Sequence, residues 1–153
     1  MWVPPEERDP IVLHAPTRKN IAIMGAVREA DGRLLAAQAD RFNTESFHAF
    51  LVGLVRLHRA GRKIVLVLDN ARWHHARKLR AWLHEHRRLL TLLFLPPYSP
   101  DLNPIERVWK LTRRLCTHNH YFPDLTDLQA VLFEQLAAWT KPNDTLRRLC
   151  AIT

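Results

Sequence analysis

The chain has few cysteines, no long apolar run and no leader-like start, and each shortage excludes a class of protein. Two cysteines among 153 residues cannot build a disulfide framework, which favours a reducing compartment. No apolar stretch approaches the roughly 18 residues that cross a bilayer. The first ten residues, acidic, polar and rich in proline, do not resemble a signal or transit peptide. We expect a soluble intracellular protein without membrane contact.

Acidic side chains are also scarce relative to basic ones. The chain has 23 Lys and Arg against 15 Asp and Glu, for a net charge of +8. This balance favours polyanionic partners, nucleic acid first, although a merely basic soluble protein remains an alternative on charge alone. The apolar fraction of 47% excludes a disordered chain. The length suits one compact domain, so we expect a single domain over residues 1–153.

Apolar periodicity and capping residues predict one α/β domain. The Asp31-Gly32 pair is a hairpin-turn signal, because such a turn needs positive φ. In chain order, we expect a weak strand at 11–14, hairpin strands at 20–27 and 33–38, a helix from the Asn43-Thr44 cap to Gly61, a strand at 63–68, a helix at 73–88, a strand at 91–95, helices at 103–117 and 124–139, and a short helix capped by Asn143.

The strand at 63–68 is a continuous aliphatic run, and 91–95 is predicted as the next buried strand. Such runs are typical of strands buried on both faces of a mixed or parallel sheet. The helix between them makes a crossover connection, which joins parallel strands.

Two carboxylates follow these strands. Asp69 comes directly after the first strand, at the carboxyl end where open α/β sheets place ligands. Glu106 lies in the first turn of the helix after a loop with four prolines between positions 96 and 104. Because each proline fixes its own φ and restricts its predecessor, this loop can hold Glu106 at a fixed place near the sheet.

Each carboxylate also has a purely structural alternative. Asp69 and Asn70 are suited to capping the next helix. Glu106 completes a capping-box pattern with Asn103 and lies one turn before Lys110, with which it can pair. We favour a metal site, because two converging carboxylates are hard oxygen ligands suited to Mg²⁺ or Mn²⁺. Two such ions can promote phosphodiester displacement, and we predict Asp69 and Glu106 as catalytic and metal-binding residues.

Basic residues gather on the two segments that begin beside these acids. Each alone is consistent with a solvated helix face, but together they favour contact with DNA phosphates. The predicted DNA-binding residues are Arg72, His74, His75, Lys78, Lys110, Arg113 and Arg114.

Two motifs carry a resemblance to a known family. Residues 66–75, Leu-Val-Leu-Asp-Asn-Ala-Arg-Trp-His-His, and residues 93–109, Leu-Phe-Leu-Pro-Pro-Tyr-Ser-Pro-Asp-Leu-Asn-Pro-Ile-Glu-Arg-Val-Trp, closely resemble the DDE transposases of the mariner superfamily, in their bacterial insertion-sequence branch. The resemblance implies a ribonuclease-H-like (integrase-like) mixed sheet flanked by helices. It also places Asp69 and Glu106 at the second and third positions of a metal-binding triad. The loop-shaping residues that it implies are Pro97, Tyr98, Pro100, Asp101, Asn103 and Pro104.

The resemblance further implies a function. A member of this family cleaves double-stranded DNA at transposon ends and transfers the strand to a target, using Mg²⁺ or Mn²⁺. It acts as a homodimer or with full-length transposase, in the bacterial cytoplasm at the nucleoid.

The chain departs from the family at its start. The family's first triad aspartate lies on an opening strand upstream of the tryptophan that Trp2 matches, so we expect that strand and aspartate to be absent and the domain to be N-terminally truncated. Asp9, Asp31 and Asp40 are the only aspartates before Asp69, so they are the candidates to replace the missing first aspartate of the triad. Glu45 is another acid that can approach the site.

The alternative is an inactive remnant that only binds DNA or full-length transposase. A basic nucleic-acid-binding module without catalytic ancestry is a third interpretation, and it leaves the proline loop unexplained.

Overall fold

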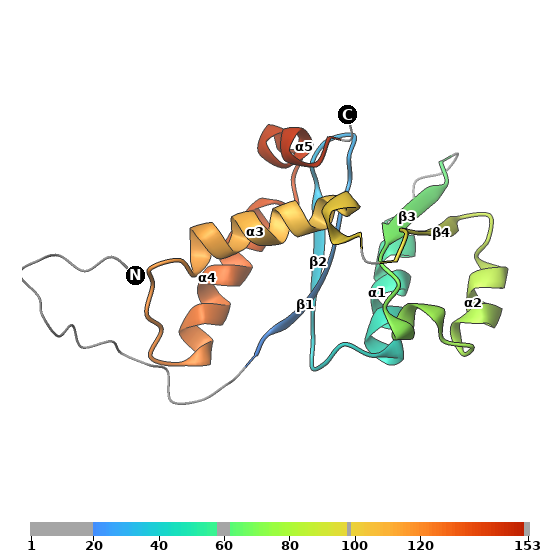
Figure 1. Ribbon diagram of the computed structural model, residues 1–153, viewed down its shortest axis with the longest axis horizontal. Coiled ribbons are helices and arrows are strands. Elements are labelled where there is room, and N and C mark those ends of the chain that lie inside the picture. Colours follow the sequence, from blue (N-terminus) through green and yellow to red (C-terminus); the bar gives the residue numbers. More distant parts are fainter. Residues whose placement is uncertain (1–19, 58–61, 98, 152–153) are drawn as a thin grey trace, which may run out of the picture.

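The computed structural model describes residues 20–57, 62–97 and 99–151. The weak strand expected at 11–14, and with it Gly61 and Tyr98, lies outside these ranges. The elements, shown in Figure 1, are β1 (Ala22–Val27), β2 (Leu34–Ala39), α1 (Thr44–Arg56), β3 (Ile64–Leu68), the 3₁₀ turn η1 (Arg72–His75), α2 (Leu79–Glu85), β4 (Leu90–Phe94), the 3₁₀ turn η2 (Pro100–Leu102), α3 (Pro104–Cys116), α4 (Leu125–Ala138) and α5 (Asp144–Cys150).

The predicted hairpin is confirmed. β1 and β2 pair antiparallel, from Ala22 opposite Ala39 to Val27 opposite Leu34. Gly32 adopts a φ of 71°, the left-handed conformation that glycine accepts without strain. The turn is closed by Arg28, whose N–H donates to the Arg33 carbonyl at 2.8 Å.

The predicted crossover unit is confirmed as well. β3 and β4 pair parallel, from Ile64 opposite Leu90 to Leu68 opposite Phe94, and α2 connects them. The pairing continues past the strand ends, where the Leu95 N–H donates to the Leu68 carbonyl at 2.9 Å. The carboxyl ends of β3 and β4 therefore lie side by side.

The predicted α/β fold with parallel and antiparallel strands is confirmed, but its described strands do not form one continuous sheet. Within residues 20–57, 62–97 and 99–151 the four strands form two separate two-stranded sheets, β1-β2 and β3-β4. The expectation that β3 and β4 are buried on both faces is also wrong, because Val65 is 58% exposed and Leu93 is 54% exposed. Only the opposite face, which includes Leu68 and Leu90, joins the core that contains α1.

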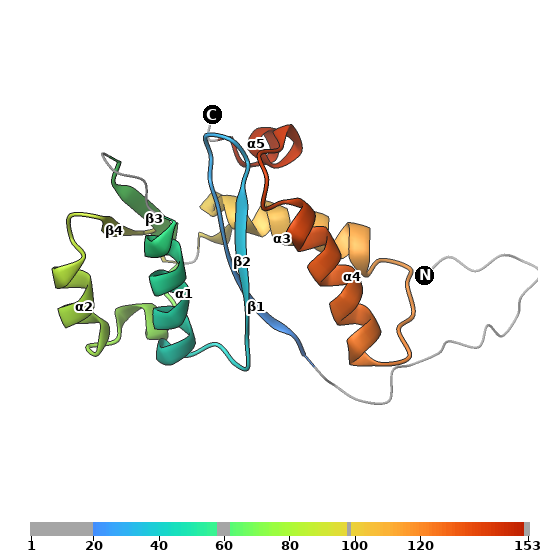
Figure 2. The ribbon, with the colours of Figure 1, turned by 180° about the vertical axis from the view of Figure 1, so that it is seen from behind.

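The hairpin separates two hydrophobic cores. In both views α1 lies on one side of it and α4 and α5 lie on the other, while α3 crosses it (Figures 1 and 2). The first core comprises Met24, Phe47, Phe50, Leu51, Leu68, Leu79 and Leu90. The second comprises Leu34, Val108, Leu136, Trp139, Leu146 and Cys150. Because the hairpin contributes Met24 to one and Leu34 to the other, it is the wall that the two cores share.

The long helix α3 packs closely against β1 at a glycine. A Cβ added at Gly25 would lie 2.6 Å from the Trp109 ring, inside any normal contact distance. Gly25 therefore lets the Trp109 ring reach the strand backbone, and this contact fixes α3, which carries Glu106 in its first turn, against the hairpin.

The helix starts follow the predicted caps. Asn43 and Ser46 form a reciprocal capping box at α1. The side chains of Asn103, Asp124 and Asn143 accept backbone N–H groups at α3, α4 and α5. Each side-chain oxygen satisfies a donor that the first helical turn leaves unpaired.

The helix expected over 73–88 is wrong in its first part. Residues 72–75 form a short 3₁₀ turn, Ala76 is extended with φ −60° and ψ 134°, and α2 begins only at Leu79. The interruption arises because the rings of His74 and His75 turn back to contact Asp69 and Asn70.

Cys116 and Cys150 are both buried, and neither forms a disulfide. Burial raises the pKa of both thiols. In the described part of the chain, no helix has the length and apolar character to cross a membrane.

Candidate active site

Asp69 is the first residue beyond β3 and presents its carboxylate to solvent. Its side chain is 61% exposed. The Ala71 N–H donates to Asp69 Oδ1 at 3.1 Å, which fixes the carboxylate over the turn that follows the strand. Asp69 therefore does not cap α2, which starts ten residues later.

The His74 side chain is hydrogen-bonded to Asp69. Its Nδ1 lies 3.0 Å from Asp69 Oδ1 and 3.1 Å from the Asp69 carbonyl oxygen. Since both neighbours are acceptors, Nδ1 carries the hydrogen and donates. The imidazole is only 13% exposed and packs on the Phe47 ring at a centroid distance of 4.3 Å. Burial lowers the pKa of His74, and hydrogen bonding to Asp69 opposes that shift only in part.

A second hydrogen-bond network joins the ends of the two parallel strands. Asn70 Nδ2 donates to the Leu95 carbonyl, just beyond β4. His75 Nε2 lies 3.2 Å from Asn70 Oδ1 and, facing an acceptor, donates to it. The His75 ring stacks on Phe94 with centroids 4.2 Å apart. This network fixes the edge from which the next loop departs.

The proline loop leads directly from that edge to α3. The Ser99 hydroxyl donates to the Pro97 carbonyl at 3.2 Å, and the Leu102 N–H donates to the Ser99 carbonyl at 3.2 Å. Asn103 is buried, at 8% exposure, and its side chain caps α3 by accepting the Ile105 N–H. Both ribbon views show the start of α3 beside the ends of β3 and β4 (Figures 1 and 2).

Glu106 lies in that first turn of α3 with an exposed side chain. The capping-box alternative is not what the structure contains, because Asn103 accepts from Ile105 and its cap involves no Glu106 side chain. Among the described residues, neither the Glu106 carboxylate nor Asp69 Oδ2 has a hydrogen-bond or ion-pair partner. Each carboxylate therefore has at least one oxygen atom without a protein partner among these residues.

Within the residues that the structure describes, no group of three His, Cys, Asp or Glu side chains is close enough to hold a metal ion. Asp31 is engaged at the hairpin turn by the Arg28 guanidinium, which holds the pKa of that carboxyl down at about 2. Asp9 is outside the described ranges. Asp40 and Glu45 line a hollow between β2 and α1.

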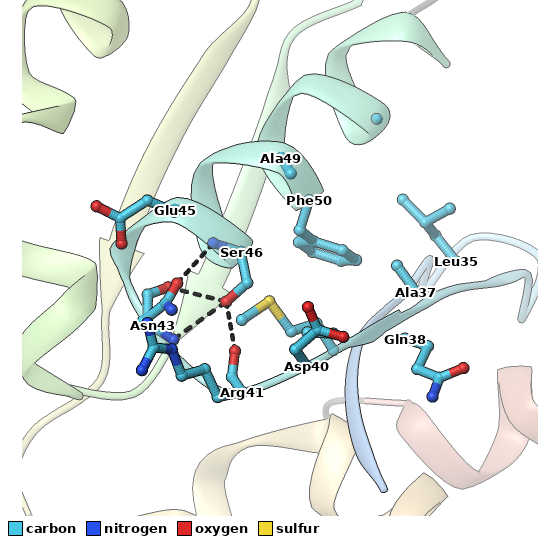
Figure 3. Close-up of a pocket in the computed structure, with 13 residues that line it drawn as sticks. Leu35, Ala37, Gln38, Asp40, Arg41, Asn43, Glu45, Ser46, Ala49 and Phe50 are labelled. Atoms are coloured by element: carbon cyan, nitrogen blue, oxygen red, sulfur yellow. Dashed lines mark hydrogen bonds between the residues drawn. The ribbon is translucent and has the colours of Figure 1, made fainter.

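An open hollow lies between β2 and the start of α1 (Figure 3). Leu35, Ala37 and Phe50 form its apolar side, and Asp40, Arg41 and Glu45 its polar side. The Asn43 and Ser46 side chains at its rim are already used in the capping box (Figure 3). Three polar side chains of this hollow, those of Asn43, Ser46 and Glu45, are therefore already engaged, the first two in the helix cap and Glu45 with Lys78.

The predicted DNA-binding residues divide into two groups. Arg72, Lys110, Arg113 and Arg114 are exposed, the last three along α3. Lys78 is 80% exposed at its side chain but pairs with Glu45 across 3.3 Å, which joins the segment before α2 to the start of α1. His74 and His75 contact Asp69 and Asn70, and their DNA-binding role stays a prediction.

Sequence reasoning missed three features of the site. The His74 contact with Asp69 depends on Phe47, which is distant in the sequence and gives no local signal. Arg107, next to Glu106, donates to the carbonyls of Leu149 and Ala151 at the end of α5, so it is a structural residue among functional neighbours. The aromatic ring of Phe42 lies exposed on Trp73, and an aromatic residue inside a polar loop was the available signal.

Comparison with known proteins gives a consistent result. Residues 1–129 match a family described as DDE superfamily endonuclease. A Sinorhizobium fredii protein, y4pE/y4sA, is 34% identical over 130 residues, which are 85% of this chain and 90% of that protein. The Tc1 transposase of Caenorhabditis elegans is 38% identical over 84 residues, 54% of this chain and 30% of that protein. The 39 kDa protein of insertion element IS630 from Shigella sonnei is 28% identical over 98 residues, 64% and 28% of the two chains.

Solved structures share the fold. The Mos1 strand transfer complex matches 98% of this chain and 44% of its own chain, with a TM-score of 0.70 and 20% sequence identity. A simian T-cell lymphotropic virus intasome, in complex with the PP2A regulatory subunit B56 gamma, matches 74% of this chain with a TM-score of 0.51 and 18% identity. The chain thus spans most of the Sinorhizobium protein but under half of the Mos1 chain and under a third of the IS630 and Tc1 proteins.

Proposed function

Because this chain belongs to the DDE superfamily endonucleases, among the mariner-superfamily transposases, and has their ribonuclease-H-like fold, we propose that it carries the DNA-cleaving and strand-transferring site of a transposase. In this proposal residues 1–153 form one catalytic domain, acting on the ends of a transposon and on target DNA. Asp69 and Glu106 are its metal-binding carboxylates.

The observation that carries the proposal is the state of the Asp69 carboxylate. One oxygen is held by the Ala71 N–H and by His74, and the other has no partner among the described residues. A carboxylate fixed on one side and open on the other fits a metal ligand, since ligand groups in metal sites are oriented by hydrogen bonds from surrounding residues. Asp69 also lies at the carboxyl end of a parallel strand, where such folds place ligands.

Glu106 supplies the second carboxylate from the other side of the proline loop. The two acids are hard oxygen donors, the set that Mg²⁺ and Mn²⁺ prefer. Such ions, when bound, supply Lewis-acid activation of water or a 3′-hydroxyl and stabilise charge on the leaving oxygen. In our proposal Asp69 and Glu106 hold Mg²⁺ or Mn²⁺, two ions by analogy with the family, and His74 keeps Asp69 in its orientation.

Exposed arginine and lysine side chains support double-stranded DNA as the partner. Lys110, Arg113 and Arg114 follow Glu106 along α3, and Arg72 follows Asp69. Phosphate contacts of this kind position a duplex without reading its sequence. We also propose that the protein acts as a homodimer or together with full-length transposase.

Nicking of a supercoiled plasmid in Mg²⁺ or Mn²⁺ tests the proposal. The expected result is metal-dependent nicking by wild type that Asp69→Asn and Glu106→Gln each abolish. Asp127→Asn and Glu134→Gln are matched controls, because both acids are exposed on α4, away from the site, and should leave nicking unchanged. Equal nicking by Asp69→Asn and wild type would contradict the catalytic assignment.

The alternative function is binding without cleavage, to DNA or to full-length transposase. It is favoured by the observation that, in the described part of the chain, no three His, Cys, Asp or Glu side chains are grouped closely enough to hold a metal ion. If the chain binds duplex DNA but shows no nicking in either Mg²⁺ or Mn²⁺, the binding function is correct for the chain alone.

A further inference from the structure

An aromatic pair, the exposed Phe42 and the partly buried Trp73, lies near Asp69. Phe42, in the bend between β2 and α1, is 48% exposed. Its ring stacks on Trp73 of η1 with centroids 6.1 Å apart and planes inclined by 11°. Phe42 belongs to neither of the two hydrophobic cores, so packing of the interior does not explain it. We call Phe42 and Trp73 the aromatic platform.

The platform is fixed relative to Asp69 by contacts on both segments. Trp73 meets the His74 ring edge to face, with centroids 5.7 Å apart, and His74 is bonded to Asp69. Phe42 directly precedes the Asn43 cap of α1, whose capping box holds the bend. The pair is therefore linked to the Asp69 carboxylate by two successive contacts, from Trp73 to His74 and from His74 to Asp69.

Positive charge flanks both rings. Arg41 and Arg72 precede Phe42 and Trp73 in the chain, and both are exposed. Two acids lie nearby: Glu45 is paired with Lys78, and Asp40 is exposed next to Arg41. Exposed aromatic rings with adjacent cations are the elements of single-stranded nucleic-acid sites, where bases stack on the rings and phosphates meet the charges.

We propose that the aromatic platform stacks an unpaired nucleobase of the DNA strand whose phosphate is held near Asp69. The inference rests on the proposed function and adds a chemical requirement to it. Cutting and rejoining DNA creates single-stranded nucleotides next to the reacting phosphate, and a flat apolar surface there holds such a nucleotide in place. Because every base has a π face, the platform tolerates any sequence.

A fluorescent base analogue tests this directly. Two duplexes of one sequence are compared, one blunt and one with a three-nucleotide single-stranded 3′ extension that contains 2-aminopurine. Both are titrated with the full chain in Ca²⁺, which prevents nicking from obscuring binding. We expect tighter binding of the extended duplex and quenching of 2-aminopurine fluorescence as the base stacks.

The variants separate stacking from general binding. Phe42→Leu keeps an apolar side chain but removes the ring, and should weaken binding of the extended duplex about 5- to 150-fold, the range of one base–aromatic stack. It should leave the blunt duplex unaffected. Phe42→Trp should restore both affinity and quenching. Tyr121→Leu is the matched control, since Tyr121 is 49% exposed between α3 and α4 and should change neither.

Each outcome decides the proposal. Equal affinity of wild type for the two duplexes, unquenched 2-aminopurine, or an equal loss on both duplexes in Phe42→Leu would overturn it. The wild-type comparison decides even if Phe42→Leu fails to fold. Failure of the proposed function is distinguishable, because that failure removes metal-dependent nicking, whereas failure of the platform removes only the preference for the single-stranded extension.

Discussion

One nitrogen of His74 reaches two oxygens of Asp69. Nδ1 lies 3.0 Å from the carboxylate Oδ1 and 3.1 Å from the main-chain carbonyl of the same residue. The imidazole cannot swing away, because it is packed on Phe47 and only 13% exposed. His74 thereby fixes both the backbone and the side chain of the proposed metal ligand.

This contact predicts a defect in metal binding. His74→Phe keeps the packing but removes the donor, and should raise the Mn²⁺ concentration for half-saturation about 10- to 100-fold, the usual cost of losing a hydrogen bond to a ligand. His74→Asn, whose amide nitrogen can stand near Nδ1, should recover part of the affinity. Electron paramagnetic resonance of free Mn²⁺ measures the change. His118→Phe, at an exposed histidine, is the control, and equal affinities in all three variants would refute the positioning role.

A methyl group on β1 should separate α3 from the hairpin. Gly25→Ala places a Cβ 2.6 Å from the Trp109 ring, so we expect a loss of about 1–3 kcal/mol in the free energy of unfolding. Gly53→Ala is the opposite case, because nothing lies within 4 Å of that Cβ inside α1, and it should stabilise by about 0.5–1 kcal/mol. Urea denaturation followed by far-UV circular dichroism compares them. If Gly25→Ala were neutral, the close approach of Trp109 would be in error.

The hairpin turn should be sensitive to acid. Arg28 holds the pKa of Asp31 at about 2, against an ordinary 3.8. A carboxyl whose pKa is lowered by folding stabilises the folded state at pH values above its pKa in the unfolded chain. This stability is lost as the pH falls from about 3.8 towards 2. Asp31→Asn should therefore be less stable than wild type at pH 7, with the difference closing near pH 2. Thermal melts at both pH values test this, with Asp144→Asn, in an exposed pair with Arg147, as a control of smaller effect.

Two arginines of α3, Arg107 and Arg113, should differ in their contribution to DNA binding. Arg113 is exposed, and if it contacts a phosphate, Arg113→Gln should reduce the slope of log affinity against log salt concentration by about 0.9. Arg107 instead bonds the carbonyls of Leu149 and Ala151, so Arg107→Gln should lower stability and leave the slope unchanged. Fluorescence anisotropy over a salt series measures both. An unchanged slope in Arg113→Gln would exclude a phosphate contact there.

Signals that lie within a few residues were predicted from the sequence. The Asp31-Gly32 turn and the caps at Asn43, Asn103 and Asn143 act on their own backbone, and each is found where expected. The break at Ala76 was not predictable in this way. It depends on the rings of His74 and His75, which contact Asp69 and Asn70 in place of continuing a helix. These rings pack against Phe47 and Phe94, which are distant in the sequence.

The candidate site divides along the same line. The positions of Asp69 at a strand end and Glu106 in a first helical turn follow from local pattern, and their role as a metal pair stays a prediction. Which basic side chains point outward does not follow from local pattern. Arg107 and His74 look like their neighbours in the sequence, and only contacts with α5 and α1 distinguish them.

The contact between Asn143 and the hairpin turn has a consequence for the order of folding. The Asn143 N–H donates to the Asp31 carbonyl at 2.9 Å, and its side chain donates to the Gly32 carbonyl across 111 residues of sequence. A closure of that span adds little entropy cost over a shorter one, since the cost grows only with the logarithm of length. It does require the intervening elements to be nearly in place. The main-chain amide hydrogen of Asn143 should therefore exchange only when α5 separates from the hairpin turn, and its protection factor reports the stability of that contact.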